Sequence, residues 1–204
     1  MSRKRFLLIG AVVLATLLFQ GCWVYSAYPL AETEADQVFD RNLLATWAQE
    51  EGCTLAISRV GEDRNYHVFY AAPREQKSGG CLLDEGQSAS FLGSLVELNG
   101  VRFLDLYPAD REDTHHSMAL HSFYKIAVSG RTLTIMPVNR DWLKEQMDSG
   151  LLPIAARLRT GGEGDDLVLT SPTRELRSYL ESNASNDSLF PQAKKIVFQR
   201  KPPS

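Results

Sequence analysis

The sequence predicts a single mainly β domain, a β-rich α+β chain folded as an antiparallel meander or barrel with two short helices late in the chain. Turn-forming residues recur at strand-length intervals, and apolar and polar residues alternate between them. Helix start signals occur near residues 139 and 171. The length of 204 residues, with 44% apolar and 23% charged residues, suffices for one hydrophobic core and excludes wholesale disorder.

The expected strands lie between these turns. Asn99-Gly100 is the strongest hairpin signal, because both residues tolerate the positive φ angles of a tight turn. Ser129-Gly130 marks a second hairpin. Eight or nine short strands, mostly in hairpin order, predict a closed or nearly closed barrel, or a sandwich. The strands are expected at residues 54–60, 66–71, 89–98, 101–107, 119–128, 132–138, 154–158, 167–170 and 196–200.

Two helices are expected among the later strands. Asn139 can cap a helix over residues 140–149. For the second helix, Ser171 is the candidate N-cap, Pro172 suits the first helical position, and Glu175 places a negative charge in the first turn. Both segments carry apolar residues about one helical turn apart, so each would bury one face against the rest of the domain.

The first residues of the chain indicate export. Arg3, Lys4 and Arg5 precede an uncharged, apolar run from Phe6 to Phe19. A basic start followed by an apolar core of this length is typical of a secretory signal peptide. The run is shorter than the ~20 residues that a helix needs to span a bilayer.

The end of this run, residues 18–22 (LFQGC), resembles the lipobox of bacterial lipoproteins. The resemblance implies that Cys22 receives diacylglycerol, is further acylated (palmitate), and becomes the new N-terminus in the cell envelope. Trp23 stands where an aspartate would favour inner-membrane retention, so in a diderm organism the resemblance implies the outer membrane, facing the periplasm. The alternatives are an uncleaved inner-membrane signal anchor and cleavage without lipidation.

The expected division of the chain follows from this N-terminus. Residues 1–21 form the signal peptide, residues 22–37 the lipidated N-terminus and a tether, and residues 38–204 a single β-rich globular domain. Removing residues 1–21 deletes three basic residues and no acidic ones, which changes the net charge from −3 to −6. This acidic balance argues against a nucleic-acid partner, since phosphate recognition usually needs a basic face.

Cys53 and Cys81 are the two cysteines that remain if Cys22 is lipidated. They lie 28 positions apart, and disulfides persist in the oxidising compartments outside the cytoplasm. The sequence therefore predicts a Cys53–Cys81 disulfide, with two unpaired thiols as the alternative. A zinc site is not indicated, because the cysteines lack C-x-x-C spacing and no histidine lies beside them.

Residues 43–47 (LLATW) resemble the G-x-W motif of lipocalin and calycin barrels, with Ala45 in place of the glycine. The resemblance implies a barrel whose one end is sealed by Trp47. A barrel of eight strands can hold a small ligand, and aromatic side chains on its strands could line that cavity. Core packing is the alternative role for these side chains. The candidates are Trp47, Tyr66, Phe69, Phe91, Phe103, Tyr107 and Phe123, together with Tyr124, which must face opposite to its neighbour Phe123.

Catalytic signatures are missing from the sequence. It contains no nucleophile elbow, zinc-protease motif, phosphate-binding loop or dinucleotide fingerprint. His115, His116 and His121 follow the acidic residues of 110–113 and could supply ligands for a divalent metal, whereas a solvated polar loop is the alternative. The sequence therefore predicts no catalytic residues and no cofactor, with a metal at these histidines as the exception.

Three functions remain open at this stage. The first is non-catalytic binding of an apolar small molecule, a lipid or an envelope partner by a membrane-tethered domain. The second is a structural or assembly role for an envelope lipoprotein with a filled core, which would present an exposed apolar patch of more than a few hundred Å². The third is a metal-dependent enzyme around His115, His116 and His121. A cavity lined by aromatic residues would favour the first.

Overall fold

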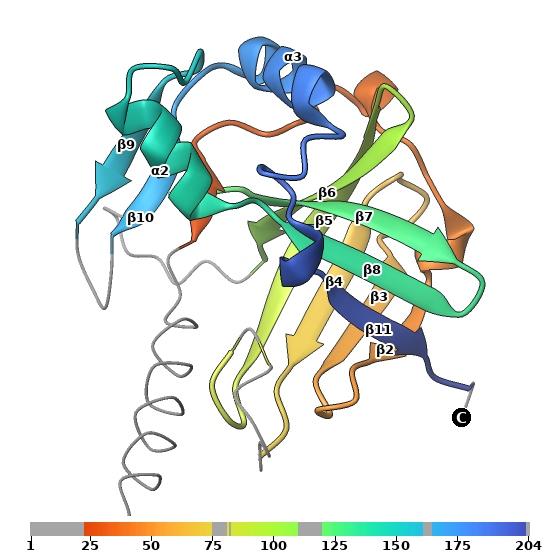
Figure 1. Ribbon diagram of the computed structural model, residues 1–204. Coiled ribbons are helices and arrows are strands. Elements are labelled where there is room, and N and C mark those ends of the chain that lie inside the picture. The colour runs from red at the N-terminus through yellow and green to blue at the C-terminus, as the bar shows by residue number, and fades with distance from the viewer. Residues whose placement is uncertain (1–22, 75–80, 82, 110–119, 161–164, 203–204) are drawn as a thin grey trace, which may run out of the picture.

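The computed structural model describes residues 23–74, 81, 83–109, 120–160 and 165–202, which form a closed eight-stranded antiparallel barrel, a separate three-stranded sheet and two helices (Figure 1). The predicted fold class is confirmed, and the barrel is found rather than the sandwich. The strand order around the barrel is β11-β2-β3-β4-β5-β6-β7-β8. Its strands are β2 (Ala45–Ala48), β3 (Thr54–Arg59), β4 (Tyr66–Ala71), β5 (Ser88–Leu98), β6 (Val101–Pro108), β7 (Ser122–Ser129), β8 (Thr132–Pro137) and β11 (Ile196–Arg200).

The hairpin predicted at Asn99-Gly100 forms between β5 and β6. Asn99 has a φ of 49° and Gly100 a φ of 74°. These positive values belong to a turn whose twist matches that of the flanking strands. The register Leu98↔Val101 continues as far as Phe91↔Pro108, which makes this the longest pairing in the barrel.

Two of the expected strands do not enter the barrel. β9 (Ala156–Arg159) and β10 (Asp166–Leu169) form an antiparallel hairpin in a second sheet with the order β1-β10-β9. The third strand of this sheet, β1 (Val24–Ser26), pairs with β10 in parallel. It gives β10 a partner on the edge that would otherwise be unpaired.

The helices lie at the predicted places, since α2 spans Arg140–Asp148 and α3 spans Thr173–Asn183. Asn139 is the N-cap of α2 as predicted, whereas the N-cap of α3 is Pro172 and not Ser171. The hydroxyl of Ser171 instead donates to Glu175 and accepts from the Ala155 N–H. At α2, Asn139 is in the N-cap position, yet its side-chain amide donates to the Ser188 carbonyl. Tertiary partners therefore replace both expected capping hydrogen bonds.

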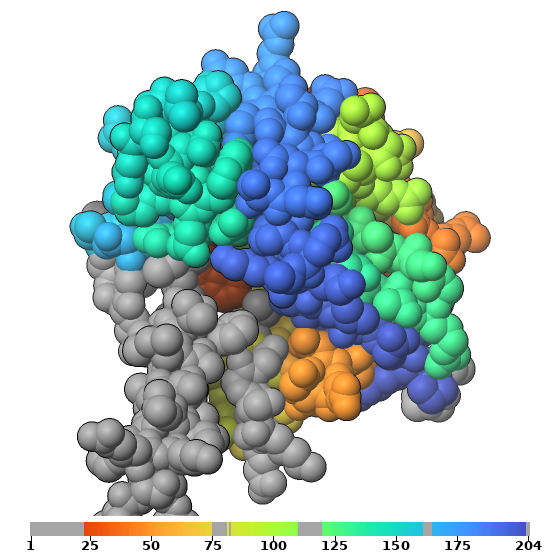
Figure 2. All heavy atoms as spheres, viewed as in Figure 1, coloured from red at the N-terminus to blue at the C-terminus, as the bar shows by residue number. Residues whose placement is uncertain are grey.

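Apolar side chains form two separate cores, one on each face of the barrel wall. The inner core fills part of the barrel interior, and the outer core lies between the barrel wall, the two helices and the small sheet. In Figure 2 the segments around α2 and α3 cover the upper part of the visible face. Inner-core members include Trp47, Tyr66, Leu95, Leu104 and Phe198, and outer-core members include Leu30, Phe103, Leu143, Leu176 and Phe190.

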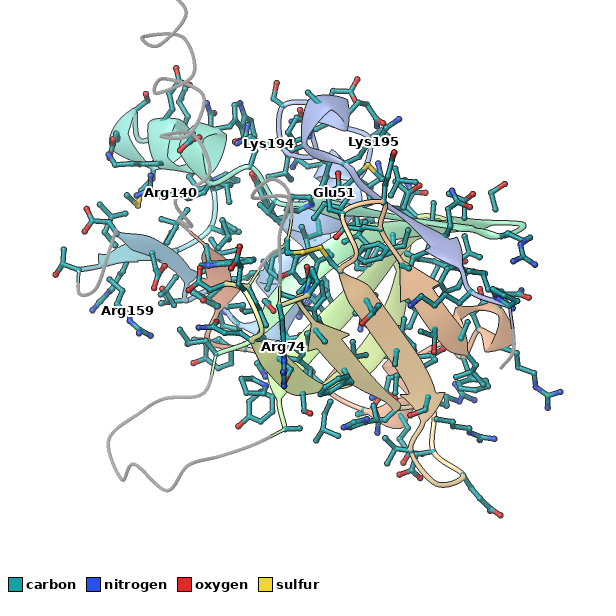
Figure 3. The ribbon with its side chains drawn as sticks, turned by 90° about the horizontal axis from the view of Figure 1, so that it is seen from below. Glu51, Arg74, Arg140, Arg159, Lys194 and Lys195 are labelled. Atoms are coloured by element: carbon teal, nitrogen blue, oxygen red, sulfur yellow. A yellow bond between two sulfur atoms is a disulfide. The ribbon has the colours of Figure 1, made fainter. Side chains whose placement is uncertain are left out.

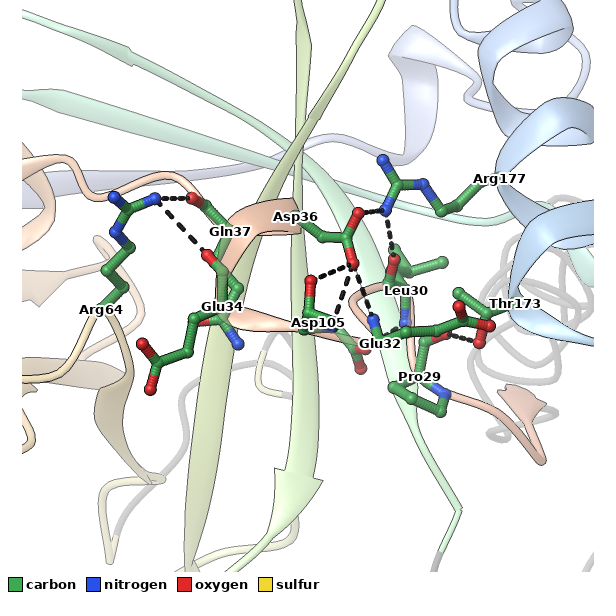
Figure 4. A network of polar contacts seen from close by, with 11 residues as sticks. Pro29, Leu30, Glu32, Glu34, Asp36, Gln37, Arg64, Asp105, Thr173 and Arg177 are labelled. Carbon is green, nitrogen blue, oxygen red and sulfur yellow. Dashed lines mark hydrogen bonds and ion pairs between the residues drawn. The ribbon is translucent and has the colours of Figure 1, made fainter.

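The segment from 23 to 37, here called the N-terminal strap, is packed on the barrel, although a tether is expected there. Leu30 is fully buried in the outer core, and its N–H donates to Oδ2 of Asp105 at 2.7 Å. The Thr173 hydroxyl donates to the Pro29 carbonyl at 2.7 Å (Figure 4). The strap thereby joins β6 of the barrel to α3, contacts that no local sequence pattern predicts.

A charged pair secures the far end of the strap. Arg177 of α3 donates to Oδ1 of Asp36, while Oδ2 of Asp36 accepts from the N–H groups of Glu32 and Thr33 (Figure 4). The Thr33 N–H, and to a lesser degree Arg177, hold the pKa of Asp36 below its usual range. Since the folded-state pKa is the lower one, this stabilisation is present above the pKa of the unfolded chain and is lost as the pH falls.

Asp105 is the buried polar residue on which this packing depends most directly. Its side chain is 1% exposed. Oδ2 accepts from the Leu30 N–H, and Oδ1 forms a hydrogen bond of 3.0 Å with Nδ1 of His121. We expect Asp105→Ala to lower the free energy of unfolding by about 1–3 kcal/mol, because the buried Leu30 N–H loses its acceptor. Hydrogen exchange should quicken at the Leu30 amide more than at the barrel amides.

Asp105→Asn is the matched control, because an amide oxygen can still accept from Leu30. We expect its effect on both measurements to be smaller than that of the alanine variant. Equal exchange rates at Leu30 in wild type and Asp105→Ala would contradict the assigned role.

Candidate functional site

A cavity of about 220 Å³ lies inside the barrel and is bounded mainly by apolar side chains. Its walls come from strands β3 to β8 and β11, and β1 of the strap contributes to it as well. It is the candidate ligand site, since binding pockets are concave, mostly apolar and carry a few polar groups. The described lining residues are Trp23, Tyr25, Leu55, Val68, Tyr70, Leu83, Phe91, Leu104, Leu106, Ser122, Tyr124, Ile135 and Phe198.

Packed side chains close one end of the barrel. Trp47 is fully buried, its Nε1–H donates to the Leu43 carbonyl at 2.9 Å, and the Arg200 guanidinium lies 4.8 Å from its ring centre. Leu43 belongs to a short 3-10 helix, Arg41–Leu43, that leads into β2. Inner-core residues around Trp47 that do not line the cavity are Leu43, Ile57, Tyr66, Leu95, Ile126 and Leu133. These residues fill the barrel end formed by the β3–β4, β5–β6 and β7–β8 turns.

The cavity lies toward the opposite end of the barrel, which carries the disulfide. Cys53 and Cys81 are bonded, with their Cα atoms 5.8 Å apart, which confirms the predicted pairing. Figure 3 looks at the molecule from this side and shows the disulfide near Glu51 of the β2–β3 loop. The bond ties the start of β3 to the segment containing Leu83, a cavity-lining residue. The disulfide therefore helps to fix the rim of the cavity.

Hydroxyl groups provide the polar part of the lining. Tyr124 shares a hydrogen bond with Ser122 and lies near Tyr25 and Tyr70. Burial raises the pKa of Tyr124 to about 12, and burial, followed by the nearby Asp166, raises the pKa of Tyr25. Both phenols are therefore uncharged at neutral pH. None of the described lining residues is lysine, arginine, histidine, aspartate or glutamate.

Gly93 makes room in the cavity wall. It faces inward on β5, between Tyr66 of β4 and Leu106 of β6 in the strand pairing. A Cβ at this position would lie 3.2 Å from Val68 Cγ2, 3.3 Å from Leu106 Cδ2 and 3.4 Å from Leu104 Cδ1. All three neighbours line the cavity, so the missing side chain lets them approach each other.

The aromatic residues expected to line a ligand site divide among the cavity, the closed end of the barrel and the outer face of its wall. Phe91 and Tyr124 line the cavity. Trp47 and Tyr66 point into the barrel but pack in its closed end. Phe103 and Phe123 belong to the outer core, Phe69 is 37% exposed on the outer wall, and the Tyr107 ring lies 4.9 Å from the His121 ring. The last four therefore lie on the outer face of the wall, and both faces of these strands are rich in apolar residues.

Lining residues that the sequence did not single out are mostly aliphatic. Leu55, Val68, Leu104, Leu106 and Ile135 give no signal that distinguishes a cavity wall from a packed core. Trp23 and Tyr25 lie in the segment for which the sequence predicts a tether. Trp47 is the residue from which the interior face could be predicted. Once one inward-facing residue is known, the alternation of side chains fixes which residues of the paired strands also face inward.

Of the three histidines considered as metal ligands, the structure describes His121. His121 pairs with Asp105 on the outer side of the barrel wall, away from the cavity lining. His115 and His116 lie outside the described residues, as do Cys22 and the predicted signal peptide. Within the described part of the chain, no group of three or more histidine, cysteine, aspartate or glutamate side chains is placed to hold a metal.

The closed barrel with a cavity toward one end gives the architecture of this protein but not its family. Comparison with family models, with curated proteins and with solved structures finds no match for this chain. Among the residues that the structure describes, no helix combines the length and the apolar character needed to cross a membrane. The function must therefore be argued from the cavity itself.

Proposed function

We propose that this chain is an exported lipoprotein, anchored in the cell envelope through Cys22, whose barrel binds a small uncharged apolar molecule. The observation that carries the proposal is the apolar cavity toward the disulfide-bearing end of a barrel whose other end is packed shut. A structural lipoprotein with a filled core, the main alternative, would need no such cavity. The lipid anchor rests on the lipobox-like sequence before Cys22.

The lining favours an uncharged ligand. A charged group buried among these side chains would lose its hydration and gain no opposite charge, which is strongly unfavourable. Tyr25, Tyr70, Ser122 and Tyr124 could exchange hydrogen bonds with one neutral polar group such as a hydroxyl. The supported ligand is therefore an apolar chain or ring with one small polar end.

The cavity volume limits the size of this ligand. Its 220 Å³ is smaller than the roughly 300–1,000 Å³ of pockets for drug-sized molecules. A single short alkyl chain fits this volume, whereas a two-chain phospholipid is too large to be enclosed.

Calorimetric titration with straight-chain alcohols tests the binding function. We expect the affinity to rise about fourfold with each added methylene group, because each buried one contributes about 0.8 kcal/mol. The rise should stop near octan-1-ol, when the cavity is full. Octanoate at pH 7 should bind at least about tenfold more weakly, because its carboxylate finds no cation in the described lining.

A pair of substitutions to phenylalanine controls this experiment. Val68→Phe places a ring in the cavity and should abolish saturable binding of octan-1-ol. Leu92→Phe makes a comparable change on the outer wall, where Leu92 is 45% exposed, and should leave the affinity unchanged. Failure of the wild-type protein to bind any alcohol saturably, or equal binding by both variants, would contradict the proposal and favour the structural role.

The anchor is tested separately, on the protein expressed in a bacterial host. The intact mass should correspond to a chain that begins at Cys22 and carries acyl groups, and the protein should fractionate with membranes. Cys22→Ala should lose the acyl mass. A membrane-bound wild-type protein that retains residues 1–21, unchanged by this substitution, would contradict lipidation and indicate an uncleaved anchor.

A further inference from the structure

The described part of the chain begins at Trp23, the residue that follows Cys22. Trp23 lines the barrel cavity, and its carbonyl accepts a hydrogen bond from the Leu167 N–H at 3.0 Å. Consecutive Cα atoms lie 3.8 Å apart. The attachment point of the proposed lipid is therefore a few ångströms from a residue of the cavity wall, with no intervening linker.

The strand that carries Trp23 is held on both sides. Val24 and Ser26 pair in parallel with Leu167 and Leu169 of β10. On the other side, Ser26 and His121 exchange two backbone hydrogen bonds of 2.8 and 2.9 Å at the start of β7. The strap contacts of Leu30 and Asp36 then continue the attachment along the outer wall. The start of the domain cannot swing away from the barrel without breaking these pairings.

The side chains near this attachment suit the surface of a bilayer. Trp23, Tyr25 and Leu83 lie together in the cavity lining at the disulfide-bearing end, and tryptophan and tyrosine favour the level of lipid headgroups. We call these three residues the rim. Asp166 and Arg159 lie near Tyr25. Figure 3 shows Glu51, Arg74 and Arg159 on the side of the molecule that carries the disulfide, so this side is of mixed charge. A protein surface of mixed charge suits zwitterionic headgroups, whereas a strongly basic surface would favour anionic lipids.

We propose that the direct connection between Cys22 and Trp23 holds the rim against the phospholipid bilayer, so that the cavity exchanges its apolar ligand with the membrane. This inference rests on the proposed lipidation of Cys22 and adds the orientation of the barrel and the source of its ligand. The occupant of the rim surface is the bilayer itself. A flexible linker after the lipidated residue would leave the orientation of the domain free, whereas here Trp23 follows Cys22 directly.

Tryptophan quenching by brominated phosphatidylcholine tests the orientation. The lipidated full-length protein is reconstituted in vesicles whose acyl chains carry bromine close to the headgroup, and its emission is compared with that in unbrominated vesicles. Trp23→Phe isolates the contribution of Trp23 from those of Trp47, buried in the closed end, and Trp142 on α2. We expect bromine to remove most of the Trp23 emission and little of the rest.

A linker variant shows whether the short connection between Cys22 and Trp23 is responsible for the quenching of Trp23. Ten glycine and serine residues inserted between Cys22 and Trp23 would give the domain a reach of roughly 16–19 Å while leaving the fold and the anchor intact. We expect quenching of Trp23 to fall in this variant. An unquenched Trp23 in the wild-type protein, or equal quenching with the linker, would overturn the inference.

The intact mass of the same sample separates this inference from the proposed function. An acyl mass on Cys22 together with an unquenched Trp23 would overturn the orientation alone. A sample without acyl mass would overturn the lipoprotein proposal and, with it, the orientation. Octan-1-ol binding by the Cys22→Ala protein is independent of both results, so the cavity function is judged on its own.

Discussion

Trp47→Ala should lower the free energy of unfolding by about 3–5 kcal/mol, the range for removing a large buried aromatic side chain. Trp47 is fully enclosed in the closed end of the barrel, below the Arg200 guanidinium. The substitution leaves a cavity that its neighbours cannot fill and deprives the Leu43 carbonyl of its donor. Urea unfolding followed by circular dichroism measures the change without relying on tryptophan emission.

Trp47→Phe separates the two contributions. Phenylalanine keeps most of the ring volume and the contact with Arg200 but cannot donate to Leu43. We expect a loss of about 1–3 kcal/mol, the cost of leaving a buried acceptor unsatisfied. A loss below about 1 kcal/mol for the alanine variant would show that Trp47 does not seal the barrel in the way described here.

Removing the disulfide should have the second largest effect. In the double variant Cys53→Ala/Cys81→Ala, the unfolded chain regains the freedom lost by closing a loop over 28 positions, which corresponds to about 3–4 kcal/mol in the chain-entropy model. For a domain of this size the melting temperature should fall by roughly 6–16 °C. Alanine is the suitable replacement, because Cys53 is fully buried and a serine hydroxyl would need a partner there.

The same variant tests the role of the disulfide at the cavity rim. We expect weaker octan-1-ol binding, since Leu83 is no longer tied to the start of β3. Treatment of the wild-type protein with a reductant should reproduce both effects, and Cys22→Ala should show neither. A melting temperature unchanged by the double substitution would contradict a stabilising role for this bond.

Local signals predict the barrel strands from β3 onward because each signal has a local physical cause, whereas β2 (Ala45–Ala48) was not among the expected strands. Asn99 and Gly100 form the expected turn since both accept positive φ angles, and the strands on either side are long enough to pair. The barrel is confirmed for the same reason, as successive hairpins leave few other arrangements. Pairing between distant segments has no such signal. The parallel pairing of Val24 with Leu167, which turns the expected tether into a strap, depends on residues far apart in the chain.

The cavity could be predicted only in part, and β6 shows why. Leu104 and Leu106 face the cavity, whereas Phe103 and Asp105 face the outer core. Alternation assigns residues to two faces but does not say which face is inside when both are buried. The larger side chain and the carboxylate lie on the outer face, against the simple expectation that aromatic residues line the interior. The outer core is formed with the helices and the strap, and no local sequence signal predicts it.

The central claim is that an uncharged apolar molecule occupies the barrel interior. Nuclear Overhauser effects between octan-1-ol and the methyl groups of the protein test it most directly. We predict contacts with Val68, Leu104 and Ile135 of the cavity and none with Leu143 and Leu176 of the outer core. The outer-core methyl groups serve as the control within the same sample. Contacts with the outer core, or no contacts at any methyl group under saturating alcohol, would contradict the claim.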